Sequence, residues 1–197
     1  MDPGQESQPW SIHRVGVVGM GLIGGSIALD LTQQGVEVQG LVHREVTAER
    51  ARSRGLAPLV STDPSCLQDC DLVILALPLE SLLTPEESLL NALPEQAVVT
   101  DVGSVKADVL AVWRDLHPRF VGSHPMAGTA QAGVDAGLPG LFCGRPWVST
   151  PESTTDPAAL EVIHQLAVRL GSHWLTADAA RHDQAVALIS HLPVIVS

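Results

Sequence analysis

The 197-residue chain is 45% hydrophobic, enough for one large domain or for one domain plus part of a second. Its formal net charge of −11 at pH 7 argues against nucleic acid or an anionic membrane as a partner. Three cysteines, Cys66, Cys70 and Cys143, form no metal-ligand pattern, so we expect free thiols and no metal site.

Residues 1–11 are expected to form a disordered tail. This stretch begins with polar residues, carries Asp2 and Glu6, and lacks the apolar core of a signal peptide. No stretch of the chain approaches the roughly 20 apolar residues of a membrane span. The sequence therefore predicts a cytoplasmic protein.

Short apolar runs alternate with helical segments, which predicts an α/β fold with a doubly wound, Rossmann-like and mostly parallel sheet. The predicted strands cover residues 14–18, 36–42, 71–78, 97–101, 120–122, 147–149 and 173–175. The predicted helices cover residues 22–34, 47–54, 81–93 with a break at Pro85, a segment after 106 that ends near 116, 157–170 and 179–197.

The first strand runs into residues 19–24, which read GMGLIG, and the first helix follows at once. A GxGxxG motif in this context favours a dinucleotide site. Gly19 permits the tight turn, Gly21 lets a pyrophosphate approach the backbone, and Gly24 lets the helix pack close to the strand. The pyrophosphate would lie at the positive end of the helix. The alternative is a glycine-rich turn without a ligand.

Ligands of such a sheet bind at the carboxyl ends of its strands. The stretches 19–24, 43–44, 103–106 and 124–129 all follow predicted strands, so we expect them to gather on one rim. Further candidates for contact with the cofactor are Leu22, Ile23, Leu77 and Asp101.

His43 and Arg44 follow the second predicted strand and bear on the choice of cofactor. An acidic residue here binds the ribose 2′-hydroxyl of NAD, whereas the Arg44 guanidinium can fork onto the 2′-phosphate of NADP. The sequence therefore favours NADP. NAD stays the alternative, because Glu45 takes the acidic position if the strand runs one residue further. A solvated charge at Arg44 is also an alternative.

His124 is the candidate for acid–base chemistry, because histidine titrates near neutrality and His124 follows a strand at the expected rim. The alternative is a structural turn histidine held by Pro125. Ser104 also follows a strand end, and its hydroxyl can bond His124 or the reacting oxygen, or cap a helix. Lys106, the single lysine, is expected to be a surface charge in the first helical turn, with contact to the cofactor as the alternative.

His182 and His191 lie on the last predicted helix, nine positions apart. That spacing is about 180° around an ideal helix, so both cannot face one site unless the helix bends. His191 is the better substrate candidate, because Pro193 loosens the helix beside it. His182 and Asp183 are expected to stabilise the start of the helix.

Taken together, these motifs resemble those of the prephenate/arogenate dehydrogenases of tyrosine biosynthesis. The matching stretches are GMGLIG at 19–24, DVGSVK at 101–106, HPMAGT at 124–129, HDQ at 182–184 and SHLP at 190–193. HPMAGT and SHLP are far more specific than the glycine motif. The chain looks most similar to the NADP-dependent arogenate dehydrogenases of cyanobacteria, in which an arginine follows the second strand.

The resemblance implies oxidative decarboxylation of arogenate to tyrosine, with hydride transfer to NADP and loss of the ring carboxylate as CO2. It implies that His124 accepts the proton of the ring hydroxyl and that Ser104 orients His124 or shares that hydrogen bond. It also implies that His191 and Thr129 line the substrate pocket. Prephenate with NAD or NADP remains an alternative.

Family members carry a C-terminal helical domain that forms a homodimer, completes the pocket and supplies an arginine for the substrate carboxylate. The resemblance therefore divides the chain into the tail 1–11, a dinucleotide-binding domain 12–177 and the truncated start of the helical domain at 178–197. Such a fragment is expected to bind cofactor and to turn over poorly.

Two other readings remain open. The β-hydroxyacid dehydrogenases share the glycine motif but place a catalytic lysine on the long helix, and this helix has none. A non-catalytic NADP-binding module would use its histidines only structurally. Replacing His124 with asparagine separates the enzyme from that module.

Overall fold

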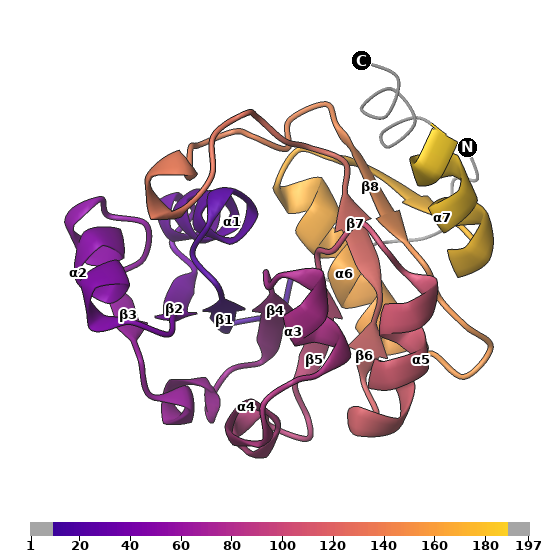
Figure 1. Cartoon of the computed structure of the whole chain (residues 1–197), viewed down its shortest axis with the longest axis horizontal. Coiled ribbons are helices and arrows are strands. Elements are labelled where there is room, and N and C mark those ends of the chain that lie inside the picture. The colour runs from indigo at the N-terminus through magenta and orange to yellow at the C-terminus, as the bar shows by residue number, and fades with distance from the viewer. Residues whose placement is uncertain (1–9, 189–197) are drawn as a thin grey trace.

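A computed structural model describes residues 10–188 of the chain. Figure 1 shows a row of strands, with α1 above the row and α4 below it. The central sheet has six strands in the order β3-β2-β1-β4-β5-β6, and every neighbouring pair is parallel. The predicted doubly wound, Rossmann-like fold is confirmed.

The strands of the central sheet are β1 (Arg14–Val18), β2 (Glu37–Leu41), β3 (Leu59–Ser61), β4 (Leu72–Leu75), β5 (Val98–Asp101) and β6 (Phe120–Val121). The α-helices are α1 (Leu22–Gln33), α2 (Glu45–Ser53), α3 (Leu79–Leu83), α4 (Glu87–Ala92), α5 (Ala107–Leu116), α6 (Pro157–Arg169) and α7 (Ala179–Val186). Two short 3₁₀ turns lie at Pro64–Leu67 and Val134–Ala136.

A second sheet contains β7 (Ser123–Pro125), β8 (Pro146–Ser149) and β9 (His173–Thr176). In it β7 is antiparallel to β8, and β8 is parallel to β9. Sequence analysis missed β7 because its three residues show no apolar alternation. It also missed β3, which is too short to give a pattern. His124 therefore lies within a strand, β7, rather than after the end of one as was expected.

The apolar residues pack in two clusters, one on each face of the central sheet. On one face, Ile27 and Leu31 of α1 and Ile163 of α6 lie in the first cluster. On the other, Leu82 of α3 and Trp113 of α5 lie in the second. This two-sided burial explains why the strands are continuous apolar runs.

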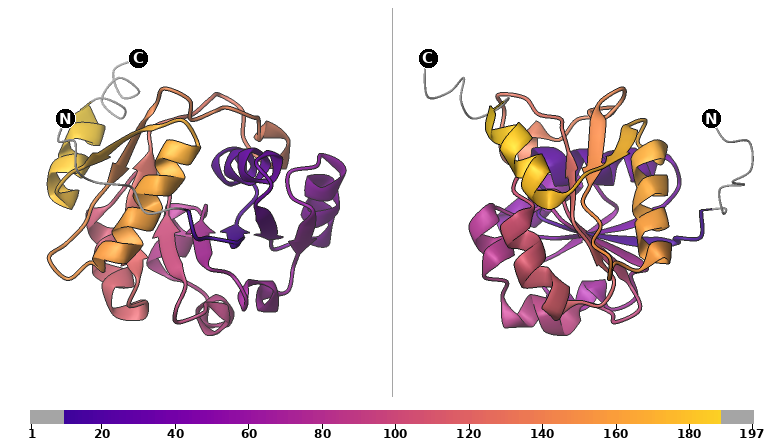
Figure 2. Two further views of the ribbon diagram at one scale, coloured as in Figure 1. Left: turned by 180° about the vertical axis from the view of Figure 1, so that it is seen from behind. Right: turned by 90° about the vertical axis from the view of Figure 1, so that its right-hand side faces the viewer.

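The two described ends of the chain, at Trp10 and at α7, pack against different parts of the domain. Within the predicted tail, Trp10 packs against the first cluster, and the Arg169 guanidinium lies 5.1 Å from its ring centroid. Residues 1–9 of that tail lie outside the described residues. At the other end, α7 lies beside α5 (Figure 2). Among the helices of residues 10–188, none is long and apolar enough to cross a bilayer.

Candidate active site

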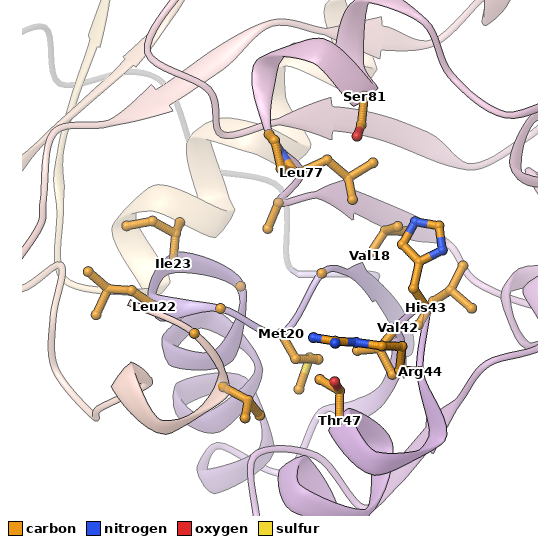
Figure 3. A pocket seen from close by; sticks show the side chains of 18 of the residues that line it. Val18, Met20, Leu22, Ile23, Val42, His43, Arg44, Thr47, Leu77 and Ser81 are labelled. Atoms are coloured by element: carbon orange, nitrogen blue, oxygen red, sulfur yellow. The ribbon is translucent and has the colours of Figure 1, made fainter. Parts of the chain in front are cut away.

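A pocket of about 1060 Å³ opens where β1, β2 and β4 end (Figure 3). Its size is at the upper end of the range for small-molecule sites, so it has room for a dinucleotide. The predicted cofactor residues that line it are Gly19, Gly21, Leu22, Ile23, Gly24, His43, Arg44 and Leu77. The structure therefore brings two of the four stretches that were expected to share one rim, 19–24 and 43–44, together at this pocket, whereas 103–106 and 124–129 do not line it.

The glycines of this pocket have separate physical roles. Gly19 has a φ of +92°, which favours glycine. A Cβ on Gly24 would lie 1.9 Å from the Gly19 carbonyl oxygen, so the helix packs directly against the turn. A Cβ on Gly21 would meet no atom within 4 Å, so the backbone there faces open space. Open backbone beside the N-terminus of α1 is the cradle that a pyrophosphate fits.

Arg44 and Glu45 occupy different positions, although they are adjacent in sequence. Because β2 ends at Leu41, the strand does not extend far enough to bring Glu45 to its end. Arg44 is the N-cap residue of α2, and its side chain extends into the pocket (Figure 3). Glu45 is the first residue of α2, and its carboxylate pairs with Arg52 of the same helix. At this point the pocket is therefore lined by the basic residue Arg44 and not by the acidic residue Glu45.

The segment 131–135 forms another wall of the pocket, and sequence analysis did not single it out. Arg54 of the α2 end donates hydrogen bonds to the carbonyl oxygens of Val134 at 2.7 Å and Gly137 at 3.0 Å. In each contact the two residues are far apart in the sequence, by 80 positions in the first and by 83 in the second. No local pattern in the sequence could reveal such a contact.

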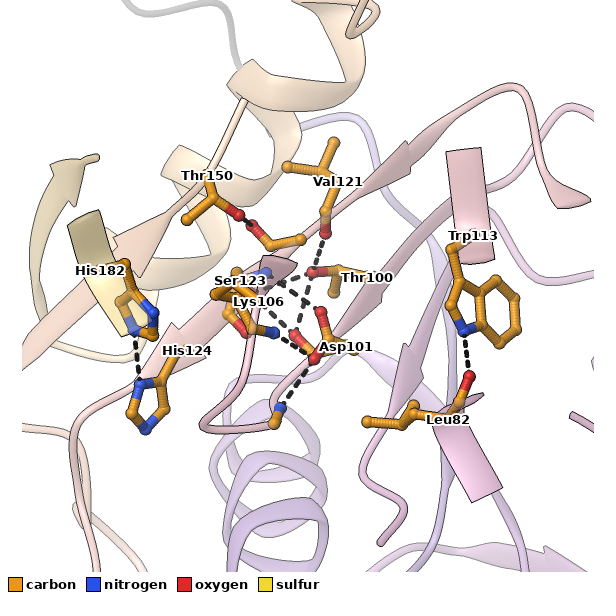
Figure 4. Close-up of polar contacts among 12 residues, drawn as sticks. Leu82, Thr100, Asp101, Lys106, Trp113, Val121, Ser123, His124, Thr150 and His182 are labelled. Atoms are coloured by element: carbon orange, nitrogen blue, oxygen red, sulfur yellow. Dashed lines mark hydrogen bonds and ion pairs between the residues drawn. The ribbon is translucent and has the colours of Figure 1, made fainter. Parts of the chain in front are cut away.

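Lys106 is fully buried, so the expectation of a surface charge was wrong. Its Nζ pairs with the Asp101 carboxylate and donates to the Ser123 carbonyl oxygen at 2.8 Å (Figure 4). Asp101 is also fully buried and accepts the N–H of Gly103 at 2.8 Å. Burial raises the pKa of Asp101 and lowers the pKa of Lys106, while their mutual attraction opposes both shifts.

His124 contacts a second histidine. Its Nδ1 lies 2.9 Å from Nε2 of His182 (Figure 4). Nδ1 of His182 in turn lies 2.8 Å from an oxygen of Asp183. Burial lowers the pKa of His124 to about 4, and His182 and Lys106 act in the same direction. His124 is therefore neutral at pH 7, as a proton acceptor must be. We call His124, His182 and Asp183 the histidine centre.

The two sites are linked through the end of β5. Val102 lines the pocket, and the preceding residue, Asp101, accepts the Ser123 N–H at 3.3 Å. Ser123 immediately precedes His124 in β7. The strand that contributes to the pocket wall therefore also fixes the strand that carries His124.

Sequence comparison places these features in a known family. A family profile described as the nucleotide-binding domain of prephenate dehydrogenase matches residues 27–176. The chain belongs to the prephenate dehydrogenase family.

Curated relatives agree with this assignment. The chain is 31% identical over 188 residues to the cyclohexadienyl dehydrogenase of Zymomonas mobilis, covering 93% of this chain and 64% of the relative. It is 32% identical over 188 residues to the prephenate dehydrogenase of Bacillus subtilis, covering 92% of this chain and 51% of the relative. The chain thus spans between half and two thirds of the lengths of these relatives.

Solved structures of the family have the same fold. The arogenate dehydrogenase of Synechocystis superposes with a TM-score of 0.87 at 40% identity, covering 93% of this chain and 66% of that one. The prephenate dehydrogenase of A. aeolicus, solved with hydroxyphenyl propionate and NAD+, superposes with a TM-score of 0.89 at 30% identity. That match covers 96% of this chain and 68% of the other.

Three further site residues were predicted for this prephenate dehydrogenase family member: Ser104, Thr129 and His191. Ser104 is exposed, and among the hydrogen bonds of residues 10–188 none joins it to His124. Thr129 is exposed, and its hydroxyl accepts the N–H of Gln131 at 3.2 Å. His191 lies outside the described residues. The roles predicted for these three residues stay predictions.

His182 is the functional candidate whose role sequence analysis underestimated. It was assigned only to the start of its helix, yet it is 4% exposed and contacts His124. The available signal was HDQ at 182–184, one of the stretches that carry the family resemblance. Within residues 10–188, no group of three or more His, Cys, Asp or Glu side chains is arranged so that it could hold a metal ion.

Proposed function

We propose that this chain binds NADP and forms the hydride-transfer half of an enzyme that converts arogenate to tyrosine by oxidative decarboxylation. One observation carries the proposal. A neutral, half-buried imidazole, His124, follows Ser123, whose N–H bonds to Asp101 at the end of β5, and the next residue, Val102, lines a dinucleotide-sized pocket. An acceptor for a proton and a cradle for a hydride acceptor are the two parts that a dehydrogenase requires.

The cofactor preference rests on Arg44. Its guanidinium extends into the pocket after β2, where it can bind a 2′-phosphate, while Glu45 is engaged by Arg52. Gly19, Gly21 and Gly24 would hold the pyrophosphate at the start of α1. When bound, the nicotinamide supplies the hydride acceptor.

The chain's own residues would manage the proton. His124 takes up the proton of the ring hydroxyl as hydride leaves the ring carbon that bears this hydroxyl. The electron pair of the bond to the ring carboxylate then completes the aromatic ring, CO2 departs, and the proton returns to the phenol oxygen. Aromatisation makes the step effectively irreversible.

The choice of arogenate over prephenate is supported by the 40% identity to the Synechocystis arogenate dehydrogenase. Prephenate is the alternative, because prephenate dehydrogenases are also among the relatives. The two substrates differ only in the side chain, an amine in one and a ketone in the other. A single assay that offers both therefore decides between them.

We further propose that α7 begins a C-terminal helical domain through which the complete enzyme forms a homodimer. The start of α7 already contacts α5, and the curated relatives extend well beyond the matched region. Substrate binding and full turnover would then require residues that follow this segment. The free thiols of Cys66, Cys70 and Cys143 support a reducing, cytoplasmic location.

Titration of the 197-residue chain with NADP and with NAD tests the cofactor proposal. Arg44→Gln is expected to weaken NADP binding about tenfold and to leave NAD binding nearly unchanged. Arg145→Gln removes the same charge at an exposed position outside the pocket and is expected to change neither affinity. Equal loss of NADP affinity in both variants would mean that only net charge matters.

Turnover is tested with the longest product of the reading frame that contains this chain. Arogenate and prephenate are each assayed with NADP and with NAD, and His124→Asn is expected to lower kcat about 100-fold or more while NADP still binds. Unchanged turnover in His124→Asn would remove His124 from the chemistry. No turnover with any pair of substrates would favour a non-catalytic NADP-binding module.

A further inference from the structure

The histidine centre contains more hydrogen-bonding groups than a single proton acceptor requires. His182 is 4% exposed in the first turn of α7, and both of its ring nitrogens have partners. The rings of His124 and His182 are nearly perpendicular, at 83°, so their 2.9 Å contact joins ring nitrogens and is not a stacking interaction. The arrangement therefore constrains where the protons lie.

Asp183 sets the direction of this chain of hydrogen bonds. Its two carboxylate oxygens accept the N–H of Lys106 at 2.8 Å and the N–H of Ala107 at 2.9 Å, at the start of α5. Burial alone raises the pKa of Asp183, but the N–H of Ala107, the His182 ring and the N–H of Lys106 outweigh it and lower that pKa. Asp183 is thus ionised at pH 7 and can only accept hydrogen bonds.

The protons on the two rings follow from that constraint. Since Asp183 only accepts, a His182 ring in its neutral form carries its proton on Nδ1 and has a lone pair on Nε2. Nδ1 of His124 must then carry a proton in order to donate to that lone pair. Nε2 of His124 is left with its lone pair, and among residues 10–188 no hydrogen bond engages it.

We propose that His182 and Asp183 are positioning residues that hold His124 in the Nδ1–H tautomer, so that its Nε2 is the atom that accepts the substrate proton. This inference rests on the proposed function for the identity of the substrate, but the tautomer is a property of the chain itself. When His124 becomes charged, its Nδ1–H donates to His182, and the same chain of hydrogen bonds leads to the Asp183 carboxylate. A third group that orients a base in this way recurs in enzymes that use histidine.

The tautomer can be measured without substrate. We would label the histidine rings of the 197-residue chain with ¹⁵N and record long-range ¹H–¹⁵N spectra at pH 7.5. The Nδ1–H form of His124 is expected to exceed the Nε2–H form about tenfold, because the wrong tautomer leaves two buried lone pairs facing each other. A predominant Nε2–H form would overturn the proposal.

A variant then tests the cause of that preference. His182→Phe keeps a ring in the space and removes both hydrogen bonds, so His124 is expected to become a mixture of tautomers. His164→Phe is the matched control, because His164 is a half-buried histidine of α6 that pairs with Glu161, away from the histidine centre. Unchanged His124 spectra in His182→Phe would overturn the proposal, and its folding is checked by the spectra of the remaining residues.

Kinetics separates this proposal from the proposed function. In the longest product of the reading frame, His182→Phe is expected to lower kcat about tenfold or more and to leave the Kd for NADP unchanged. If His124→Asn has no effect on turnover, the proposed function fails, whereas the tautomer result stands. If His124→Asn is inactive and His182→Phe retains full kcat, the positioning role fails by itself.

Discussion

The dinucleotide pocket takes its lining from short stretches that follow consecutive strands, whereas the histidine centre takes its members from β7 and α7 and is tied to β5 and the start of α5. The pocket offers backbone and exposed side chains to its ligand, and His43, for example, is 74% exposed. By contrast, His182 and the neighbouring Asp101 and Lys106 are almost fully buried.

This difference predicts how substitutions in each region act. Exposed side chains of the pocket bind ligand without supporting the fold, so their loss should affect affinity alone. Buried polar groups satisfy one another, so loss of one member leaves another without its partner and should lower stability as well. Three experiments test the contrast, beginning with the largest expected effect.

Lys106→Met is expected to lower the free energy of unfolding by about 4 kcal/mol, because it leaves the fully buried Asp101 carboxylate without its cation. Urea denaturation of the 197-residue chain measures the effect. Arg145→Met, at an exposed position, controls for loss of a cation and should stay within about 0.5 kcal/mol of the parent. Adding Asp101→Asn to Lys106→Met should restore part of the loss, and an undiminished loss would argue against pairing as its cause.

Gly24→Ala and Gly21→Ala test within the pocket itself whether a substitution lowers stability as well as affinity, or affinity alone. A Cβ at Gly24 meets the Gly19 carbonyl oxygen at 1.9 Å, so this variant should lose about 3 kcal/mol of stability and bind NADP poorly. A Cβ at Gly21 meets no atom within 4 Å, so that variant should keep its stability and lose only NADP affinity. Thermal unfolding with and without NADP reports both quantities. Equal destabilisation in the two variants would refute the separate roles assigned to these glycines.

The stability of the chain should depend on pH through His124. Its pKa is lowered from 6.5 to about 4, mainly by burial, so the folded state favours the neutral ring. The stabilisation from this preference is complete above pH 6.5 and is lost as the pH falls towards 4. Between these values the parent should lose about 2 kcal/mol more than His124→Asn. Parallel losses in urea titrations of both proteins would show that His124 is not the group responsible.

The fold was accessible from the sequence because its signals are local. Apolar runs predicted β1 and β5 almost to the residue and located β4, although the predicted strand 71–78 extends three residues beyond its end at Leu75. Pro85 correctly predicted the break between α3 and α4. β3 and β7 were missed because three residues carry too little pattern. Arg44 and the glycines could be assigned to the pocket because the order strand, turn, helix fixes where adjacent residues point.

The centre around His124 was accessible only in part. The sequence singled out His124 by residue type and by its motif, but its spacing favoured Ser104 as a partner, and the hydrogen bond goes to His182, 58 positions away. Lys106 was expected at the surface because a lysine in a first helical turn is normally solvated. Its burial depends on Asp101 and on Ser123, which reaches it from another strand.

The sequence by itself determined the longer strands and helices, the glycine cradle and the two candidates after the second strand, Arg44 and Glu45, because each depends on residues within about a dozen positions of one another. Only the tertiary structure decided which polar groups pair in the interior. A buried charge or imidazole is stable only beside a partner, and that partner is chosen by which elements the sheet brings into contact, a property that no single stretch of the chain contains.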